Sequence, residues 1–392
     1  MLSGRVTCFK CLQPSNTLPP IDVTLFGICI VNLPFLGLNF NQQTGGNLNT
    51  LDQTTIFLVE ALIQNKFFLL FSFIFGWGVQ IQINSAKKSS INFSKRYFRR
   101  LVCLAFIGAM HAILVFSGDI LVLYAILGLF LWLFRNKTSQ TLYKIALSIL
   151  LIALLALTVL LYLIATWEPL INLFQDNSSH LGGSYLTATL GRLSHWPATF
   201  IFLSLYQGPL AFVAFLLGLS AAKSNFFEKH SIGQKALSKI FPWLLTIGIL
   251  TSFYLAQLPE NDDSFLSLLR FFGLLIIAPV TAAAYLHILL SISNQINLPK
   301  VILRAGQNSL SCYVLQGIIA GLIFGGYGLG YYGKLGHSTL LLLSILITFK
   351  SHSLFSKGVV SLIGRISTNE PGKKAIMPFT VTLKPPLTLL LT

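Results

Sequence analysis

Long apolar runs, separated by short polar connections, are the feature that most constrains how this chain of 392 residues can fold. About 20 consecutive apolar residues form a helix long enough to cross the hydrocarbon core of a bilayer. Runs of this kind lie near residues 21–40, 66–83, 101–117, 119–134, 142–165, 198–222, 240–258, 265–292, 309–332 and 338–362. The sequence therefore predicts an all-α fold, a polytopic integral membrane helical bundle of about ten transmembrane helices in a lipid bilayer.

The composition is typical of the same class of protein. Hydrophobic residues make up 54% of the chain and charged residues only 10%, with a mean hydropathy of +0.75, whereas soluble domains carry about 25% charged residues. The net charge is +16. Because the basic residues stand in short tracts between apolar runs, they indicate membrane topology rather than a nucleic-acid surface, and we expect no nucleic-acid partner.

The connections alternate in charge along the chain. The tract KKSSINFSKRYFRR at 87–100 is rich in Lys and Arg, whereas SGD at 117–119 and PENDD at 259–263 are acidic. Basic connections stay in the cytoplasm by the positive-inside rule. We therefore expect both termini to be cytoplasmic and the acidic connections to lie outside.

Two ionisable residues interrupt the apolar stretch GAMHAILVFSGDILVLYAILG at 108–128. Counted from a cytoplasmic start at Leu101, His111 lies about 15 Å into the membrane at 1.5 Å per residue. Asp119 begins the returning helix at the outer surface, where a carboxylate accepts from free N–H groups. We therefore interpret Asp119 as a helix cap and expect it to lie away from His111. His111 is either a structural histidine satisfied within the bundle or the candidate catalytic residue, a general base that faces a cavity.

The longest outer connection ends in GRLSHWPATF at 191–200. Long loops commonly carry function, so Arg192 and His195 are candidate substrate-binding residues for an acceptor outside the cell. The alternative is an interfacial helix that is anchored by Trp196. Arg304, at the cytoplasmic entrance of a later helix, is the third candidate, either as a contact for phosphate groups or as an anchor at the membrane interface.

Cysteine and glycine motifs are less specific. Cys8 and Cys11 form a lone C-x-x-C without a second pair or a nearby histidine, so we expect no metal site. The glycines of GLIFGGYGLGYYGKLG at 321–336 favour close helix packing, and the alternative is a broken helix that lines a cavity.

Four blocks together resemble the YeiB family of bacterial membrane proteins, a domain of unknown function. They are LFGICIVN at 25–32, ALIQNKFFLLFSFIFGWGVQIQ at 61–82, RYFRRLVCLAFIGAMHAILVFSGDILVLYAILGL at 96–129 and RAGQNSLSCYVLQGIIAGLIFGGYGLGYYGKLG at 304–336. The resemblance covers residues 20–348. It implies a multi-pass protein of the bacterial inner membrane, with a cytoplasmic tail at 1–20, a transmembrane domain of YeiB type at 21–362 and a divergent C-terminal tail at 363–392.

The YeiB family is distantly similar to transmembrane acyltransferases of the heparan-α-glucosaminide N-acetyltransferase type. Those enzymes take an acyl group from a cytosolic acyl-CoA and deliver it to a sugar on the far side of the membrane. Their key histidine lies in the connection to the second span. Here that connection, residues 39–66, contains no histidine, so their catalytic residue has no counterpart in this chain.

Three hypotheses of function follow. The first is acyl transfer from acyl-CoA, the one donor indicated, to an outer acceptor such as an envelope glycan, with His111 as general base. The second is transport of a small solute, with Pro34, Pro209 and Pro279 in gating helices. The third is a non-catalytic membrane scaffold. The sequence leaves the oligomeric state open.

Overall fold

The computed structural model describes residues 20–39, 42, 48–90, 92–166, 178–228, 231–259, 265–295 and 309–356. This part of the chain consists of helices and turns, without a strand. The helices are α1 Pro20–Gly37, α3 Thr50–Leu62, α4 Phe67–Lys88, α5 Phe93–Leu114, α6 Leu121–Leu133, α7 Ser139–Thr166, η1 Ser178–Gly182, α9 Tyr185–Tyr206, α10 Gly208–Lys223, α11 Ile232–Ala256, α12 Phe265–Gln295, α14 Ser309–Phe324 and α15 His337–Ser356.

Many of these helices are long and apolar enough to cross a membrane. Within the described ranges, five segments qualify by length and composition: Thr50–Lys88, Phe93–Leu114, Ser139–Leu163, Ile232–Ala256 and Phe265–Ser293. The bent pair α9 and α10 qualifies as a sixth span when taken together, and α1, α6, α14 and α15 contain shorter apolar helices. The predicted class, an all-α polytopic membrane protein, is confirmed.

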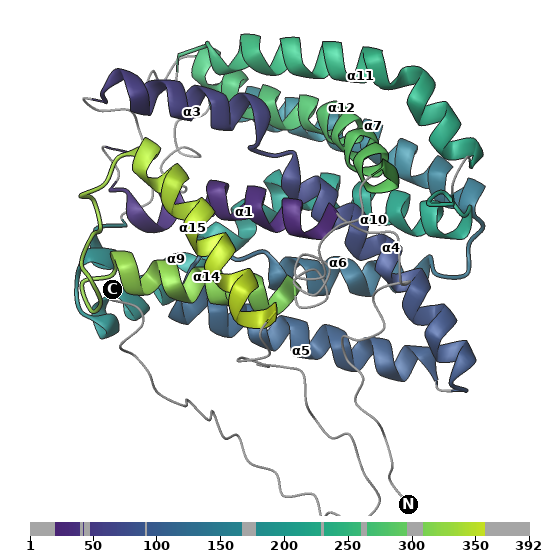
Figure 1. The fold of residues 1–392 in the computed structure, drawn as a ribbon, viewed down its shortest axis with the longest axis horizontal. Coiled ribbons are helices and arrows are strands. Elements are labelled where there is room, and N and C mark those ends of the chain that lie inside the picture. Colours follow the sequence, from purple (N-terminus) through teal and green to yellow (C-terminus); the bar gives the residue numbers. More distant parts are fainter. Residues whose placement is uncertain are drawn as a thin grey trace, which may run out of the picture.

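The packing of α4 against α10 forms much of the interior, with α7 on the other side of α10. A Cβ at Gly76 would collide with the carbonyl of Phe215, and a Cβ at Gly218 with the carbonyl of Phe73. Glycine at these two positions lets the helix backbones approach closely. Figure 1 shows α11 at the edge of the bundle, beside α12, and α1 towards its middle, where it packs on α4, α14 and α15.

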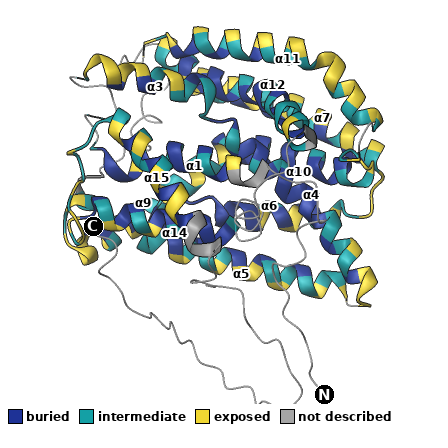
Figure 2. Ribbon diagram, in the orientation of Figure 1, coloured by how far each residue is buried: buried dark blue, intermediate teal, exposed yellow. Residues whose placement is uncertain are grey.

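Large apolar side chains are exposed along the outer helices. Leu151 and Leu155 of α7, and Trp243 and Leu250 of α11, are 65 to 70% exposed. In Figure 2 the outer sides of α11 and α5 carry many exposed residues. Soluble proteins rarely expose contiguous apolar surface on this scale, so these faces suit contact with lipid tails.

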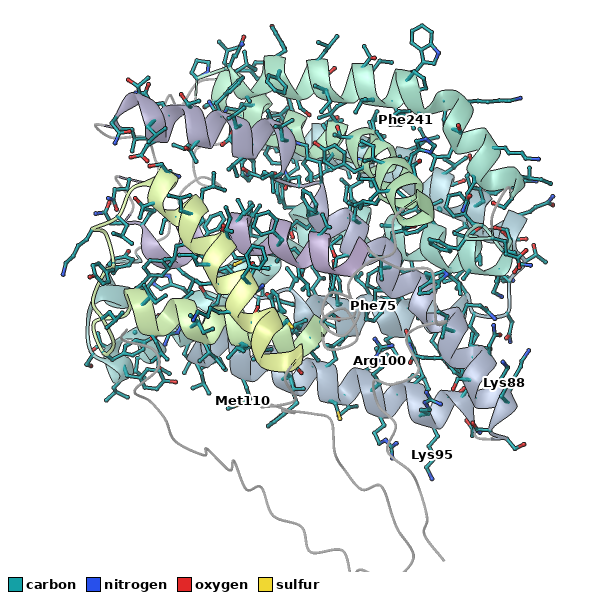
Figure 3. All side chains as sticks on the ribbon, in the orientation of Figure 1. Phe75, Lys88, Lys95, Arg100, Met110 and Phe241 are labelled. Atoms are coloured by element: carbon teal, nitrogen blue, oxygen red, sulfur yellow. The ribbon has the colours of Figure 1, made fainter. Side chains whose placement is uncertain are left out.

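The basic connections gather at one end of the bundle, here called the Lys-rich end. The Lys223 ammonium donates to the carbonyls of Arg135, at 2.6 Å, and Lys137, at 2.8 Å. Lys87 lies near enough to Lys223 to interact with it electrostatically. Figure 3 shows Lys88 and Lys95 at this end and Met110 farther along α5. Three connections that the sequence assigns to the cytoplasm therefore lie together.

The opposite end holds the 115–120 turn, η1 and residues 325–336. Here Asp52 of α3 accepts from both the backbone N–H and the hydroxyl of Ser338, each at 2.7 Å, and so caps the start of α15. The helix α14 ends at Phe324, earlier than the predicted 309–332 span, and Gly330 and Gly333 adopt positive φ angles of 67° and 68° in the turn that follows. Glycines after Phe324 therefore form a turn, whereas the sequence analysis favoured close helix packing along this segment.

Candidate functional site

A cavity of about 330 Å³ lies among α1, the start of α4 and α9, and the 63–65 and 115–118 turns and α14 complete its wall. Its polar lining residues are Asn32, Gln64, Asn65, Ser117, His180, Arg192, His195, Thr199, Tyr206, Gln207 and Tyr313. Most other lining residues are apolar, and no Asp or Glu lines the cavity in the part of the chain that the structure describes. Small-molecule sites have this volume and this mixture of many apolar and few polar groups.

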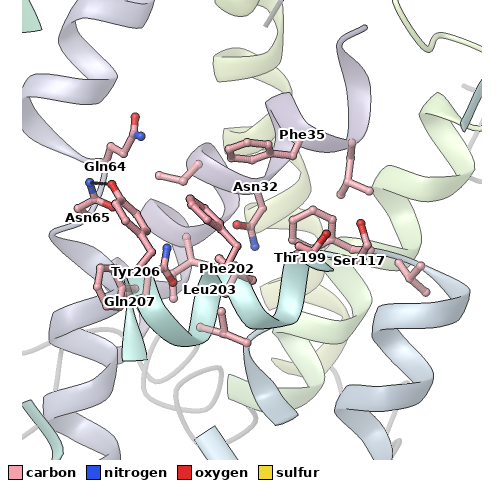
Figure 4. Close-up of a pocket in the computed structure, with 18 of the residues that line it drawn as sticks. Asn32, Phe35, Gln64, Asn65, Ser117, Thr199, Phe202, Leu203, Tyr206 and Gln207 are labelled. Carbon is pink, nitrogen blue, oxygen red and sulfur yellow. Dashed lines mark hydrogen bonds between the residues drawn. The ribbon is translucent and has the colours of Figure 1, made fainter. Parts of the chain in front are cut away.

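The cavity is a slot that follows one face of α9. Arg192, His195, Thr199, Phe202 and Tyr206 all line it, at the spacing of successive helical turns. At 1.5 Å per residue, the 14 residues from Arg192 to Tyr206 span about 21 Å. In Figure 4, Thr199, Phe202 and Tyr206 succeed one another along this face. We call its two ends the cationic end (His180, Arg192, His195) and the amide end (Gln64, Asn65, Tyr206, Gln207).

Two helix breaks meet at the amide end. The α3–α4 junction contains Asn65 at φ 64°, and α9 and α10 are bent by 54° at Gln207. The Asn65 amide donates to the Tyr206 hydroxyl at 3.2 Å (Figure 4), and that hydroxyl donates to the Phe271 carbonyl at 3.2 Å. Within a membrane, irregular backbone is tolerated where it lines a cavity or is buried in protein, which agrees with the position of both breaks.

Arg192 binds the C-terminal end of α5 and also lines the slot. Its side chain is buried, with 2% of the residue exposed. Nε donates to the Ile113 carbonyl at 3.0 Å and Nη2 to the Leu114 carbonyl at 2.9 Å. These carbonyls belong to the last turn of α5, where partners are missing and the helix dipole is negative. Arg192 therefore fastens α9 to α5, a structural task that the sequence did not predict, while its role in substrate binding stays a prediction.

His195 lies beside Arg192 at the cationic end. Its ring stacks on that of His180, with centroids 5.3 Å apart and planes 8° apart, and both rings line the slot. Within the described residues, the ring nitrogens of His195 have no hydrogen-bond partner. His195 therefore lines the slot, and its role in substrate binding stays a prediction.

His111 and Asp119, which the depth argument separated, form a buried pair. The Nδ1 atom of His111 lies 2.7 Å from Oδ2 of Asp119. The other carboxylate oxygen accepts from the N–H of Leu121 at 2.7 Å, so Asp119 is a cap for α6 as well. The separation was wrong because α5 ends at Leu114, within one turn of His111, and the tight turn brings Asp119 back onto the ring.

The remaining ring nitrogen of His111 faces a second, small cavity. Nε2 is buried without a hydrogen-bond partner within the described residues, and it packs against Gly317 of α14. The small cavity is about 10 Å³ and shares Asn32, Phe116 and Tyr313 with the wall of the slot. A space of this size is close to the minimum for one water molecule. An Asp–His pair with one free nitrogen is the arrangement that a general base requires.

The sequence interpretation missed several residues of the site. Tyr313 and Asn32 sit in apolar helices and border both cavities, and a lone Tyr or Asn in an apolar run gives little signal. Arg304 lies outside the described residues. No group of three or more His, Cys, Asp or Glu side chains that could hold a metal occurs among the residues described.

A separate cluster of charges lies near the amide end. Nη2 of Arg270, in α12, is 2.7 Å from Oε2 of Glu60, in α3. The fully buried Lys66 ammonium donates to the Glu60 carbonyl at 2.7 Å. Removing one partner of a buried ion pair is strongly destabilising, so these contacts hold the α3–α4 break in place.

Comparison with known proteins finds relatives of unknown function. Residues 221–357 match a family model described as "Protein of unknown function (DUF418)". The chain is similar to the uncharacterized protein YxaH of Bacillus subtilis (strain 168), with 28% identity over 370 residues, which cover 86% of this chain and 89% of that protein. It is also similar to the uncharacterized protein YeiB of Escherichia coli (strain K12), with 29% identity over 143 residues, covering 33% of this chain and 35% of YeiB.

These matches confirm the resemblance to YeiB-like membrane proteins of unknown function. They do not extend to the transmembrane acyltransferases. No solved structure matches the chain.

Proposed function

We propose that this YeiB-like membrane protein transfers an acyl group, with His111 as the general base and Asp119 as the residue that orients it. The observation that carries the proposal is the free, buried Nε2 of His111 beside a cavity, with Nδ1 held by a carboxylate. Buried polar atoms are almost always hydrogen-bonded. Among the described residues Nε2 has no such partner, so it is available to the proton of an acceptor, and this supports catalysis over the scaffold hypothesis.

The chemistry follows from the orientation of the ring. With the Nδ1 proton donated to Asp119, Nε2 carries a lone pair and can accept the proton of an acceptor hydroxyl or amine. The acceptor atom then attacks the thioester carbonyl of an acyl-CoA, the carbon–sulfur bond breaks, and the CoA thiolate takes the proton back from Nε2. The Asp119 carboxylate stabilises the transient imidazolium.

Access to Nε2 requires a side chain to move. Phe116 and Tyr313 stand between the slot and the small cavity. Rotation of either ring would join the two cavities and bring an acceptor in the slot to the base. The acyl-CoA would reach the site from the Lys-rich end, which we assign to the cytoplasm of a bacterial inner membrane, and Arg304 remains the candidate for its phosphates.

The test is a transfer assay with purified protein in proteoliposomes, radiolabelled acetyl-CoA and cell-envelope glycans as acceptors. We expect label to enter an acceptor with the wild type and not with His111→Gln. The matched control is His287→Gln, because His287 lies in α12 against Phe241 and lines neither cavity. Transfer that is unchanged by His111→Gln would refute the role of His111, and no transfer from any acyl-CoA would refute the proposal.

Transport of a small solute is the second candidate. The observation that favours it is the meeting of two helix breaks, at Asn65 and Gln207, on one cavity, since transporters commonly bind their substrates where membrane helices are interrupted. Counterflow of a labelled solute in proteoliposomes, without any acyl donor, would support transport over acyl transfer.

A further inference from the structure

Among the residues that the structure describes, no carboxylate balances the positive charge at the cationic end of the slot. Arg192 is buried and lines the slot, and its hydrogen bonds go to two backbone carbonyls and the Thr189 hydroxyl. No carboxylate pairs with it among the described residues. A buried charge is costly unless an opposite charge accompanies it. An anionic group in the slot would lower that cost.

The described acids on either side of the slot, Asp119 towards the cationic end and Glu60 towards the amide end, are already engaged. Asp119 is bonded to His111 and to the backbone of Leu121, and Glu60 is paired with Arg270. The imidazole of His195, with no partner in the described chain, lies beside Arg192 on the same face of α9. The cationic end therefore offers a charged donor and at least one imidazole to the same ligand.

The middle of the slot is apolar. Phe35 of α1 and Phe202 and Leu203 of α9 line it (Figure 4), together with Val31 of α1. The groups at the amide end are neutral, and two of them, Asn65 and Tyr206, are hydrogen-bonded to each other. A ligand that fills the slot thus needs an anionic group at one end and an apolar body next to it.

We infer that the slot binds an amphiphile with an anionic headgroup, either a carboxylate or a phosphate, seated at His180, Arg192 and His195, with its chain along α1 and α9. The inference rests on the proposed function only in taking this molecule as the acyl acceptor. Binding itself requires no acyl transfer. In the topology assigned above, the headgroup lies towards the outer face of the membrane, so the ligand enters from that side.

The test is equilibrium binding to the full chain in phosphatidylcholine nanodiscs, with the signal from empty nanodiscs subtracted. The probes share one twelve-carbon chain: radiolabelled dodecanoate, dodecyl phosphate, and the neutral dodecan-1-ol. We expect one or both anionic probes to bind about tenfold or more tightly than the alcohol, because only an anion adds a charge–charge attraction to its hydrogen bonds with Arg192. The better anion identifies the headgroup as carboxylate or phosphate.

Variants locate the headgroup. The double variant His180→Gln/His195→Gln should weaken binding of the better anion about tenfold and leave the alcohol unchanged, whereas His287→Gln should alter neither. Equal binding of all three probes to the wild type would overturn the inference. Binding of the better anion that is not weakened in the double variant would place the headgroup away from the two histidines and overturn the inference too.

Asp119→Asn separates this inference from the proposed function. It should abolish acyl transfer yet bind the anionic probe as the wild type does. Anion-selective binding without transfer from any donor would leave the inference standing and the proposed function refuted. If a neutral acceptor is acylated and excess dodecanoate and dodecyl phosphate do not inhibit this transfer, the proposed function stands and the inference is refuted.

Discussion

Single charged side chains at the end opposite the Lys-rich one serve two purposes. Asp119 caps α6 and orients His111, Asp52 caps α15, and Arg192 covers the last carbonyls of α5 while it lines the slot. In a chain with only 10% charged residues, each such group satisfies backbone atoms that would otherwise be buried without partners.

The sequence could identify His111 but not its partner. Depth along a straight helix separates His111 from Asp119, whereas the actual contact depends on where α5 ends and how tightly the next five residues turn. The available signal was the short separation in sequence, because His111 lies only eight residues before Asp119 and the SGD turn reverses the chain between them. Arg192 was predicted to bind substrate, whereas its hydrogen bonds to the end of α5 were not predicted, because a hydrogen bond to a distant carbonyl leaves no mark in the sequence.

Replacement of Arg192 should destabilise the protein. Arg192→Met leaves the carbonyls of Ile113 and Leu114 without their donors, and we expect the free energy of unfolding to fall by about 2 kcal/mol. Arg192→Lys, which can reach one carbonyl, should cost less. Denaturant unfolding in detergent measures both, and equal stability of Arg192→Met and the wild type would contradict the capping role.

At the scale of helices, the close packing of α4 on α10 and two breaks between helices determine where the slot lies. The glycines at 76 and 218 let α10 lie directly on α4, and the breaks at Asn65 and Gln207 turn the neighbouring helices around the amide end. Apolar runs predicted the positions of the helices because burial in lipid needs only length and hydrophobicity. They did not predict where α14 ends, because Gly, Tyr and Leu at 325–332 are apolar enough to continue a span but form a turn.

The α4–α10 contact gives a prediction at this scale. Gly218→Ala should lower the free energy of unfolding by about 1–3 kcal/mol, because its Cβ meets the backbone of Phe73 and the helices must move apart. Gly208→Ala is the matched control on the same helix, since its Cβ would meet only Leu123, at an ordinary 3.7 Å. Unfolding in detergent compares the two, and an equal effect of both substitutions would count against the close contact.

The two ends of the molecule differ, in agreement with the alternation of basic and acidic connections along the sequence. Basic connections that are far apart in the sequence lie together at the Lys-rich end, and the slot runs from the amide end to the cationic end near the opposite face. The positive-inside rule predicted this grouping because it assigns all these connections to one compartment. The slot itself could not be predicted, because it forms from residues of seven separate stretches of the described sequence.

The orientation can be measured by cysteine labelling in intact cells. In a background with Cys8, Cys11 and Cys103 replaced by serine, Leu329→Cys should react with a membrane-impermeant maleimide from outside. Ser90→Cys, in the basic connection, should react only after the cells are opened. The reverse pattern would contradict the topology.

The most direct test of the central claim is the rate of acyl transfer in His111→Gln, Asp119→Asn and the double variant, with His287→Gln as control. If the pair acts as one base, each single substitution should lower the rate about 10²–10⁴-fold, and the double variant should be no slower than the worse single one, because the effects of residues that act as a unit do not add. Wild-type transfer rates in both single variants would contradict the account.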